Sequence, residues 1–198
     1  MSKNAFHMTA SGQNQLEIYK NLRQTMRAKR LALSDIEQAQ AAQTVLHQAI
    51  ELFEHYHPST VALYLPFNGE ISPLAILEFL QKQYIRCCLP VLHPFTPNHL
   101  QFFAYSSEQD LHKNRFAILE PKLNVQKIVP LSEIDLIFVP LVACDKQHNR
   151  LGMGGGFYDR TLAQMPNAVT VGLAYCCQCI EQLPTQSWDV PLKHILLG

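Results

Sequence analysis

Residues 135–140 read DLIFVP, a nearly unbroken apolar run bounded by an aspartate and a proline. Such a run predicts a strand, and its lack of polar alternation predicts that helices bury both of its faces. We therefore expect the fold to be built around this strand.

Strands and helices alternate on either side of this run. Further short apolar runs predict strands at 60–66, 85–90, 100–105, 169–174 and 194–197. Helices are expected at 14–32, from Ser34 to just before Pro58, at 73–83 and at 158–165. Alternating strands and helices favour parallel pairing through crossover connections. The sequence thus predicts a flexible tail at residues 1–12 and a single α/β domain at 13–198. We expect that domain to be a three-layer α/β/α structure with a mostly parallel, Rossmann-like sheet.

Two of the predicted helices carry specific start signals. Ser34 and Glu37 are spaced as a capping box, in which the serine accepts a bond from the amide three residues on and the glutamate reaches back. Ser72 followed by Pro73 predicts an N-cap and a first helical residue.

Composition limits the classes of partner. The chain has 198 residues, enough for one full-sized core. Its 16 basic and 16 acidic side chains balance, which argues against nucleic acid as a partner. No apolar run approaches the roughly 20 residues needed to cross a bilayer, so we expect no membrane partner and a cytoplasmic protein.

Of the six cysteines, only Cys176 and Cys179 have the C-x-x-C spacing of zinc and redox sites, and no second ligand pair with good spacing accompanies them. We expect them to be reduced, apolar side chains on strands. A metal site at Cys177 and Cys179 is the alternative.

The first predicted helix carries four cations at intervals of three and four residues: Lys20, Arg23, Arg27 and Arg30. This spacing places them along one side of the helix. That side is either a solvated face with its aliphatic stems lying along the surface, or in part an approach to a bound anion.

Residues 150–160 read RLGMGGGFYDR. This segment is not a P-loop, because Phe157 follows the last glycine, and its spacing also fails the dinucleotide fingerprint. Clustered glycines still allow backbone amides to converge on an anion, and Arg150 adds a forked cation. A surface turn is the alternative. Asp159 is either a favourable helix-start acid or a carboxylate that faces a magnesium ion.

Ligands of parallel α/β sheets bind beyond the carboxyl ends of the strands. This rule points to the loops after strands 60–65 and 135–139, which hold Glu70 and the glycine stretch. Taken alone, Glu70 is also accounted for as a charge at a loop end before a helix.

Residues 135–162, DLIFVPLVACDKQHNRLGMGGGFYDRTL, resemble the signature of the 5-formyltetrahydrofolate cyclo-ligase family, also called methenyltetrahydrofolate synthetases. In that signature a strand ending in proline leads to Cys-Asp, then to Arg-Leu-Gly, a glycine cluster and Tyr-Asp. The supporting segments are the basic first helix, YLPFNGEIS at 64–72, FAILEP at 116–121 and WDVPL at 188–192.

The resemblance implies a reaction with two substrates. ATP, with Mg²⁺, drives closure of the N5-formyl group of 5-formyltetrahydrofolate onto N10, giving 5,10-methenyltetrahydrofolate, ADP and phosphate. The implied intermediate is a phosphorylated formyl group. We expect a monomer, although the sequence does not indicate the oligomeric state, nor the length of any polyglutamate tail on the folate.

The resemblance also implies roles for individual residues. Arg150 is implied as the catalytic residue, and Asp159 and Asp189 as ligands of magnesium. The residues implied to bind folate are Leu65, Glu70 and Phe157. The residues implied to bind ATP are Lys20, Asn21, Leu22, Arg23, Arg150, Leu151, Gly152, Met153, Gly154, Gly155, Gly156, Phe157 and Tyr158.

Three positions depart from the family pattern. Family members often have a lysine where this chain has Tyr19, and here Lys20 comes one place later. Many have a lysine at Gly155 and a tyrosine at Phe157. The first two differences remove or move a cation near the nucleotide. Whether Tyr19 or Lys20 replaces the family's lysine therefore stays open.

Two other functions also stay open. A non-catalytic relative that keeps the fold and binds folate or RNA is motivated by the shifted lysine. A sugar-phosphate isomerase or acyltransferase would share the three-layer build, since a fold alone does not define a function. Such an enzyme needs a poised catalytic Glu or Lys, of which the sequence carries no sign.

Overall fold

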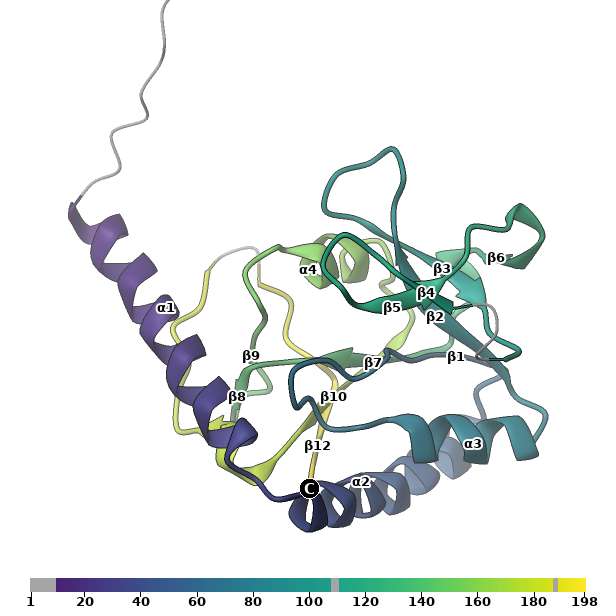
Figure 1. Cartoon of the computed structure of the whole chain (residues 1–198), viewed down its shortest axis with the longest axis horizontal. Helices are drawn as coiled ribbons and strands as arrows, with labels where there is room; N and C mark the ends of the chain where they lie inside the picture. The colour runs from purple at the N-terminus through teal and green to yellow at the C-terminus, as the bar shows by residue number, and fades with distance from the viewer. Residues whose placement is uncertain (1–9, 108–110, 187–188) are drawn as a thin grey trace, which may run out of the picture.

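The strand predicted at 135–140 is the centre of the structure. The computed structural model describes residues 10–107, 111–186 and 189–198 and has the expected three layers (Figure 1). In β7 (Leu136–Pro140), Leu136 and Phe138 pack into one core while Ile137 and Val139 pack into another. All four side chains are fully buried. An apolar residue at every position is thus explained by burial on two faces.

The main sheet has seven strands in the order β12-β10-β7-β1-β2-β3-β6. The first five of these pair in parallel, β3 pairs antiparallel with β2, and β6 pairs antiparallel with β3. The mostly parallel sheet is therefore confirmed. The other strands of this sheet are β1 (Thr60–Ala62), β2 (Arg86–Leu92), β3 (Leu100–Ala104), β6 (Ile128–Val129), β10 (Val169–Ala174) and β12 (His194–Leu197).

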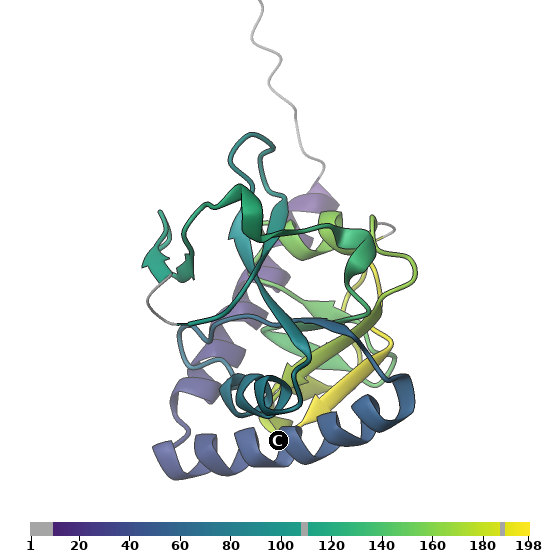
Figure 2. The same cartoon turned by 90° about the vertical axis from the view of Figure 1, so that its right-hand side faces the viewer.

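Helices cover both faces of the sheet. α2 (Asp35–Tyr56) and α3 (Leu74–Lys82) lie beneath it, and the short α4 (Phe157–Leu162) lies on the opposite side, as both views show (Figures 1 and 2). The predicted capping box is present at the start of α2, with the Ser34 side chain accepting from the Glu37 amide. The short 3-10 helices are η2 (Val125–Lys127), η3 (Leu131–Glu133) and η4 (Cys176–Gln178).

The first helix, α1 (Ala10–Leu31), runs along one end of the sheet and not over a face (Figure 1). It packs against η4, which directly follows β10, and against β8. Tyr19 and Met26 of this helix are buried together with Val142 and Leu151. α1 is thereby anchored beside the loops that leave the carboxyl ends of the strands.

Two small sheets lie outside the main one, and the sequence patterns did not predict them. β4 (Leu111–Lys113) and β5 (Leu119–Pro121) form a hairpin. β8 (Ala143–Asp145) pairs with β9 (Arg150–Leu151) and with β11 (Cys179–Ile180). Strands of two or three residues are too short for a periodic signal.

Several predicted boundaries are corrected by the structure. The strand predicted at 60–66 ends at Ala62, and the last ladder bond beyond it joins the Leu63 amide to the Cys88 carbonyl at 2.9 Å. Pro73 is the N-cap of α3 and not its first residue, although the Leu74 amide bonds the Ser72 hydroxyl at 3.4 Å. α4 ends at Leu162, three residues before the predicted end. The predicted tail lies largely outside the described residues, but residues 10–12 are already helical.

All six cysteines are free, as expected, but Cys176 and Cys177 lie in η4 and not on a strand, and Cys176 is exposed. Within the described ranges, no group of three or more His, Cys, Asp or Glu side chains could hold a metal ion, which disfavours the alternative at Cys177 and Cys179. Among the helices described, none is both long and apolar enough to span a membrane.

The two-sided burial of β7 yields a stability prediction. Phe138→Ala should lower the free energy of unfolding by about 3 to 5 kcal/mol, because it opens a cavity beneath the sheet where Phe53 packs edge-on against this ring. Phe95→Ala is the matched control, since that ring is 89% exposed and its removal should change stability by less than about 0.5 kcal/mol. Urea denaturation measures both, and equal effects would contradict the assignment of the core.

Candidate active site

The site is positioned by a reversal in strand order. From β1 the chain continues through α3 to β2 on one side, whereas β7, on the other side of β1, leads outward to β10 and β12. Such a switch point opens a crevice at the carboxyl ends of the two central strands. β1 and β7 pair directly, with Val61 opposite Leu136. The loops after these two strands therefore lie side by side, as the sequence predicted.

The glycine loop joins β9 to α4, and two of its glycines have backbone conformations that other residues rarely adopt. Gly154 has φ +93° and Gly156, the N-cap of α4, has φ +66°. Glycine reaches such angles without a steric penalty. These two positions account for the glycine-rich sequence by geometry. Because α4 has only six residues, the positive end of its dipole contributes less to an anion site than the sequence led us to expect.

Two arginines bind the carbonyl oxygens of this loop. The Nε atom of Arg23, on α1, donates to the Gly152 carbonyl at 2.8 Å. Its guanidinium also lies against Gly154, where an added Cβ would sit 3.3 Å from the arginine Cζ. Arg160 donates to the Gly155 carbonyl at 3.0 Å. The arginines thus offset the negative ends of these peptide dipoles, which would otherwise repel an anion beside the loop.

Arg150 connects the glycine loop to the C-terminal part of the chain. Its side chain is only 3% exposed, donates to the Val190 carbonyl at 2.7 Å and forms an ion pair with Asp159. Burial lowers the pKa of this guanidinium, and the charges of Asp159 and Asp189 oppose that shift. The two predicted metal ligands therefore lie around one arginine.

The donor set fits a magnesium ion that is held partly by substrate. Asp159 uses one carboxylate oxygen on Arg150, and Asp189 uses one on the Gln186 amide at 2.8 Å. Magnesium in proteins is commonly bound by one or two carboxylates together with phosphate oxygens and water. The second oxygen of each aspartate suits that role.

Glu70 lies on the other side of the switch point, in the loop after β1. Its side chain is 12% exposed, and one carboxylate oxygen accepts from the Phe67 amide at 3.2 Å while the other is 3.9 Å from Nη1 of Arg30. Burial raises the pKa of Glu70 to about 7, against the opposing effect of the Arg30 charge. The carboxyl group is therefore divided between its two protonation states near neutral pH.

Tyr158, on α4, is within electrostatic range of both Glu70 and Arg150. Burial raises the pKa of its phenol, the nearby Glu70 charge adds to this shift, and Arg150 opposes it. A neutral phenol between a carboxylate and a guanidinium can donate to one partner and accept from another. Tyr158 is thus a neutral polar group whose pKa responds to charges on both sides of the site.

The structure brings together most of the predicted site residues but separates some. Lys20 and Asn21 are exposed on α1, whereas Leu22 packs with the apolar residues between α1 and β8. Leu65 is partly buried against the core beneath the sheet. Phe157 packs edge-on against Phe116, from the β4–β5 hairpin, with ring centroids 6.2 Å apart.

Tyr19 does not replace a cation. It is buried, its hydroxyl donates to the Pro184 carbonyl at 3.1 Å, and the Gln186 side chain donates to that hydroxyl at 3.3 Å. The Arg23 guanidinium lies over the tyrosine ring at 5.6 Å. Tyr19 therefore supports Arg23 and ties α1 to the segment that precedes Asp189.

Sequence reasoning assigned no site role to Arg27, Arg30, Arg160 or Phe116. Arg27 and Arg30 belong to the cation stripe of α1, but Arg30 is fully buried, so the solvated-face interpretation is wrong for it. Arg160 carried no signal apart from its place after the glycines. Phe116 reaches Phe157 from 41 positions earlier in the chain, a contact that only the fold reveals.

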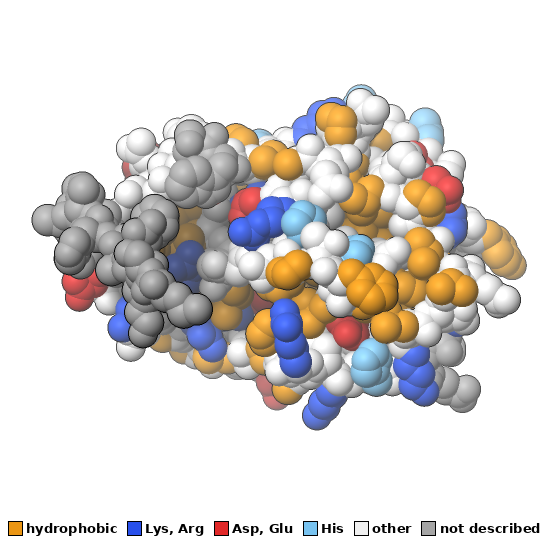
Figure 3. Space-filling model, turned by 90° about the horizontal axis from the view of Figure 1, so that it is seen from above, with side chains coloured by type: hydrophobic (Ala, Val, Ile, Leu, Met, Phe, Trp, Pro, Cys, Tyr) orange, Lys and Arg blue, Asp and Glu red, His pale blue; other side chains and the backbone are white. Residues whose placement is uncertain are grey.

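The face at the top of Figure 1 carries several kinds of side chain. Seen from above, it shows basic, histidine and exposed hydrophobic side chains, and acidic side chains are fewer (Figure 3). A face of this character suits a ligand that combines anionic groups with an aromatic ring.

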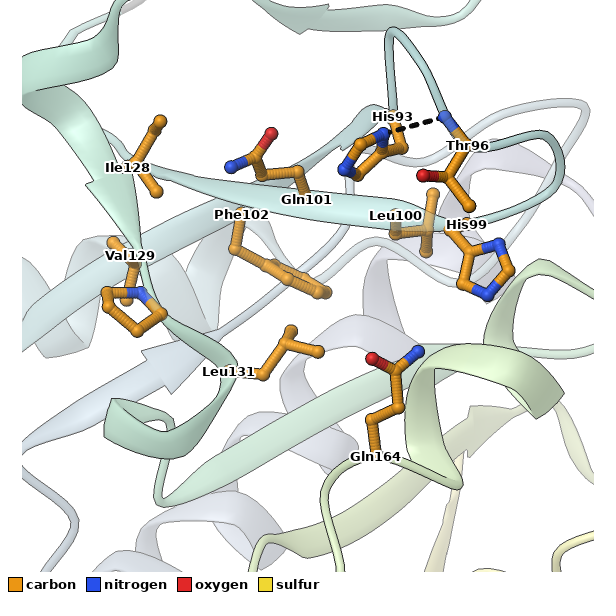
Figure 4. Close-up of a pocket in the computed structure, with 11 residues that line it drawn as sticks. His93, Thr96, His99, Leu100, Gln101, Phe102, Ile128, Val129, Leu131 and Gln164 are labelled. Carbon is orange, nitrogen blue, oxygen red and sulfur yellow. Dashed lines mark hydrogen bonds between the residues drawn. The ribbon is translucent and has the colours of Figure 1, made fainter.

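A separate cavity of about 300 Å³ lies between β3, β6 and the segment after α4. His93, His99, Gln101 and Gln164 line it, together with apolar side chains that include Phe102 (Figure 4). None of its lining residues belongs to the predicted site.

Comparisons with known proteins agree with one another. The model of the 5-formyltetrahydrofolate cyclo-ligase family matches residues 16–198. A 5-formyltetrahydrofolate cyclo-ligase of Haemophilus influenzae is 50% identical over 179 residues, covering 89% of this chain and 96% of that protein. One of Escherichia coli K12 is 42% identical over 177 residues, covering 86% and 95%.

Solved structures give the same result. The 5,10-methenyltetrahydrofolate synthetase of Aquifex aeolicus superimposes with a TM-score of 0.78 at 30% identity, covering 91% of this chain and 89% of that one. A synthetase of the same name from Mycoplasma pneumoniae superimposes with a TM-score of 0.72 at 27% identity, covering 90% and 97%.

The glycine loop yields a prediction with an internal control. Gly154→Ala should lower the free energy of unfolding by about 1 to 3 kcal/mol, because alanine is strained at a positive φ and its methyl group would press on Arg23. Gly152→Ala should be tolerated to within about 1 kcal/mol, since no atom lies within 4 Å of its added Cβ. Chemical denaturation compares the two variants, and equal losses would contradict this account of the loop.

Proposed function

The chain belongs to the 5-formyltetrahydrofolate cyclo-ligase family and is a ligase, and from this premise we propose that it uses ATP and Mg²⁺ to cyclise 5-formyltetrahydrofolate. The products would be 5,10-methenyltetrahydrofolate, ADP and phosphate. We further propose that it acts as a monomer in the cytoplasm.

One observation carries this proposal. A glycine loop whose carbonyls bind Arg23 and Arg160 precedes Tyr158, and Tyr158 is within electrostatic range of both the largely buried Glu70 carboxylate and Arg150. The first half suits the phosphates of a nucleotide, and the second suits the N–H groups of a folate ring. A reaction that transfers a phosphoryl group from ATP to a folate needs both binding halves next to each other. The non-catalytic and isomerase or acyltransferase alternatives have no comparable feature in their favour.

The proposed chemistry begins with phosphoryl transfer. The formyl oxygen attacks the terminal phosphorus of ATP, and the bond from that phosphorus to the bridging oxygen breaks, releasing ADP. N10 then attacks the formyl carbon and loses its proton. The carbon–oxygen bond breaks last and phosphate leaves, so that N5 and N10 share one methenyl carbon. Phosphorylation thus turns a poor leaving group into a good one.

The protein's part in this transfer is alignment and positive charge, which are the main requirements of phosphoryl transfer. The amides of residues 152–156 and the guanidinium of Arg23 would hold the terminal phosphates, with Lys20 approaching from the exposed side of α1. Arg150 would stabilise the charge that develops on the transferred group. Asp159 and Asp189 would hold Mg²⁺, which when bound neutralises phosphate charge.

Glu70 would orient the folate. An ionised carboxylate can accept hydrogen bonds from pterin N–H groups, whereas a protonated one loses part of that capacity. Leu65 and Phe157 would contact the apolar faces of the ligand. The formyl group would then lie between Glu70 and the glycine loop.

The proposal is tested by incubating the protein with 5-formyltetrahydrofolate, ATP and magnesium. The expected result is the near-ultraviolet absorbance of the methenyl product, together with one ADP for each folate converted. Well-folded protein that forms neither product would contradict the proposed function.

Removal of the Arg150 charge should slow the reaction. Arg150→Ala should reduce kcat/KM by an amount equivalent to about 2 to 4 kcal/mol, the typical contribution of a group that stabilises charge in the transition state. Because Arg150 also holds Val190 and Asp159, thermal denaturation of the variant must accompany the kinetics. Arg86→Ala, which breaks an exposed ion pair with Glu133 at the start of β2, is the control and should leave kcat/KM unchanged. An unimpaired, folded Arg150→Ala would remove Arg150 from the reaction.

A further inference from the structure

Arg30 is a fully buried cation in the last turn of α1. Its Nε atom donates to the Asn68 carbonyl at 2.9 Å, and Nη1 donates to the Leu141 carbonyl at 3.4 Å. The same Nη1 is 3.9 Å from the Glu70 carboxylate. One side chain therefore contacts both the loop that carries Glu70 and the end of β7.

These contacts span the switch point of the sheet. Asn68 lies in the loop after β1, and Leu141 directly follows β7. The two strands are direct neighbours, and the crevice between their carboxyl ends is where ligands bind in such folds. Arg30 thus ties α1, which also carries Arg23, to both walls of the crevice.

Structural stability alone does not account for this arrangement. Nη2 of Arg30 and Nε of Arg27 are buried and have no hydrogen-bond partner among the described residues. Buried donors in native proteins are nearly always paired, and an apolar side chain commonly replaces a buried ion pair without loss of stability. Arg30 is buried, leaves one of its hydrogen-bond donors unpaired, and lies beside Glu70, the carboxylate proposed to bind the substrate. This combination indicates a functional role.

The charged and titratable groups around Glu70 come from four elements. Arg27 and Arg30 approach from α1, Tyr64 from the segment after β1, and Tyr158 from α4. Tyr175, directly after β10, completes the set. Burial raises the pKa of all three phenols, so they are neutral near pH 7. The ionised form of Glu70 is favoured by the Arg30 charge, which has the largest effect, by the hydrogen bond from the Phe67 amide and by the Arg27 charge.

We propose that Arg30 is a positioning residue for the folate: it fixes the loop of Glu70 and keeps that side chain a carboxylate that can accept hydrogen bonds from the ring. The inference rests on the proposed function, because contact between Glu70 and the folate is itself proposed. Arg30 acts through Glu70 and need not touch the reacting atoms.

The test is the pH dependence of 5-formyltetrahydrofolate binding, measured by calorimetry without ATP between pH 5.5 and 9. Glu70 has a raised pKa, so affinity in the wild type should be full above pH 7 and weaken as the pH falls through about 7. Glu70→Gln should remove this transition, and any remaining pH dependence belongs to other groups.

Two substitutions separate the two effects proposed for Arg30, which are to fix the loop of Glu70 and to favour the ionised form of Glu70. Arg30→Met should move the midpoint upward by about one unit or more, because loss of an adjacent opposite charge raises a carboxyl pKa by that much. At pH 7 the dissociation constant should then rise at least about fivefold, the loss of ionised Glu70 for a one-unit shift. Arg30→Lys should keep the midpoint close to that of the wild type, but it should bind more weakly at every pH, since one ammonium group cannot hold both loop carbonyls.

Lys29→Met is the matched control, because it removes a cation from an exposed position one residue away. Its binding curve should coincide with that of the wild type. A carbon-13 NMR titration of the Glu70 carboxyl in ligand-free protein measures the same midpoints without substrate.

If the wild type fails to bind the folate, the proposed function fails. The inference about Arg30 is overturned instead by a folded Arg30→Met with an unshifted Glu70 midpoint. If Arg30→Met does not fold, a folded Arg30→Lys that binds as tightly as the wild type at pH 9 overturns it.

Discussion

The structure depends on the way a basic helix closes the carboxyl end of a parallel sheet. Burial of β7 on both faces fixes the sheet between two helical layers, and the strand order then reverses beside it. α1 covers the resulting crevice and places a fully buried guanidinium between two loop carbonyls and a carboxylate. Taking charges out of water is costly unless they meet partners, so this contact holds helix and loops in a single relative position.

The two halves of the site follow from that position. On one side Arg23 binds the Gly152 carbonyl from α1, and on the other Arg30 binds the Asn68 carbonyl from the same helix. Seven residues, about two helical turns, separate these arginines and place them on nearly the same face. One rigid element therefore sets the distance between the glycine loop, proposed to bind phosphate, and Glu70, proposed to bind the folate.

Much of this could be predicted from the sequence where the signal is local. The run at 135–140, the capping box at Ser34 and the glycine loop all depend on neighbouring residues, and each is found where it was expected. The burial of Arg30 could not be predicted from the sequence, because a helical stripe of cations has the same spacing whether water or a loop covers it. Tyr19 was equally ambiguous, since its partners at 184 and 186 are distant in the chain. The β4–β5 hairpin, which supplies Phe116, is too short to leave a periodic pattern.

The central claim is that one crevice at the β1–β7 switch point holds both substrates. A crystal structure with a non-hydrolysable ATP analogue and 5-formyltetrahydrofolate tests it most directly. The account predicts the terminal phosphate against the amides of residues 152–156, with the pterin beside Glu70 and the formyl group between them. A nucleotide bound elsewhere, for example in the cavity lined by His93 and His99, would contradict the account. A pterin without contact to Glu70 would do the same.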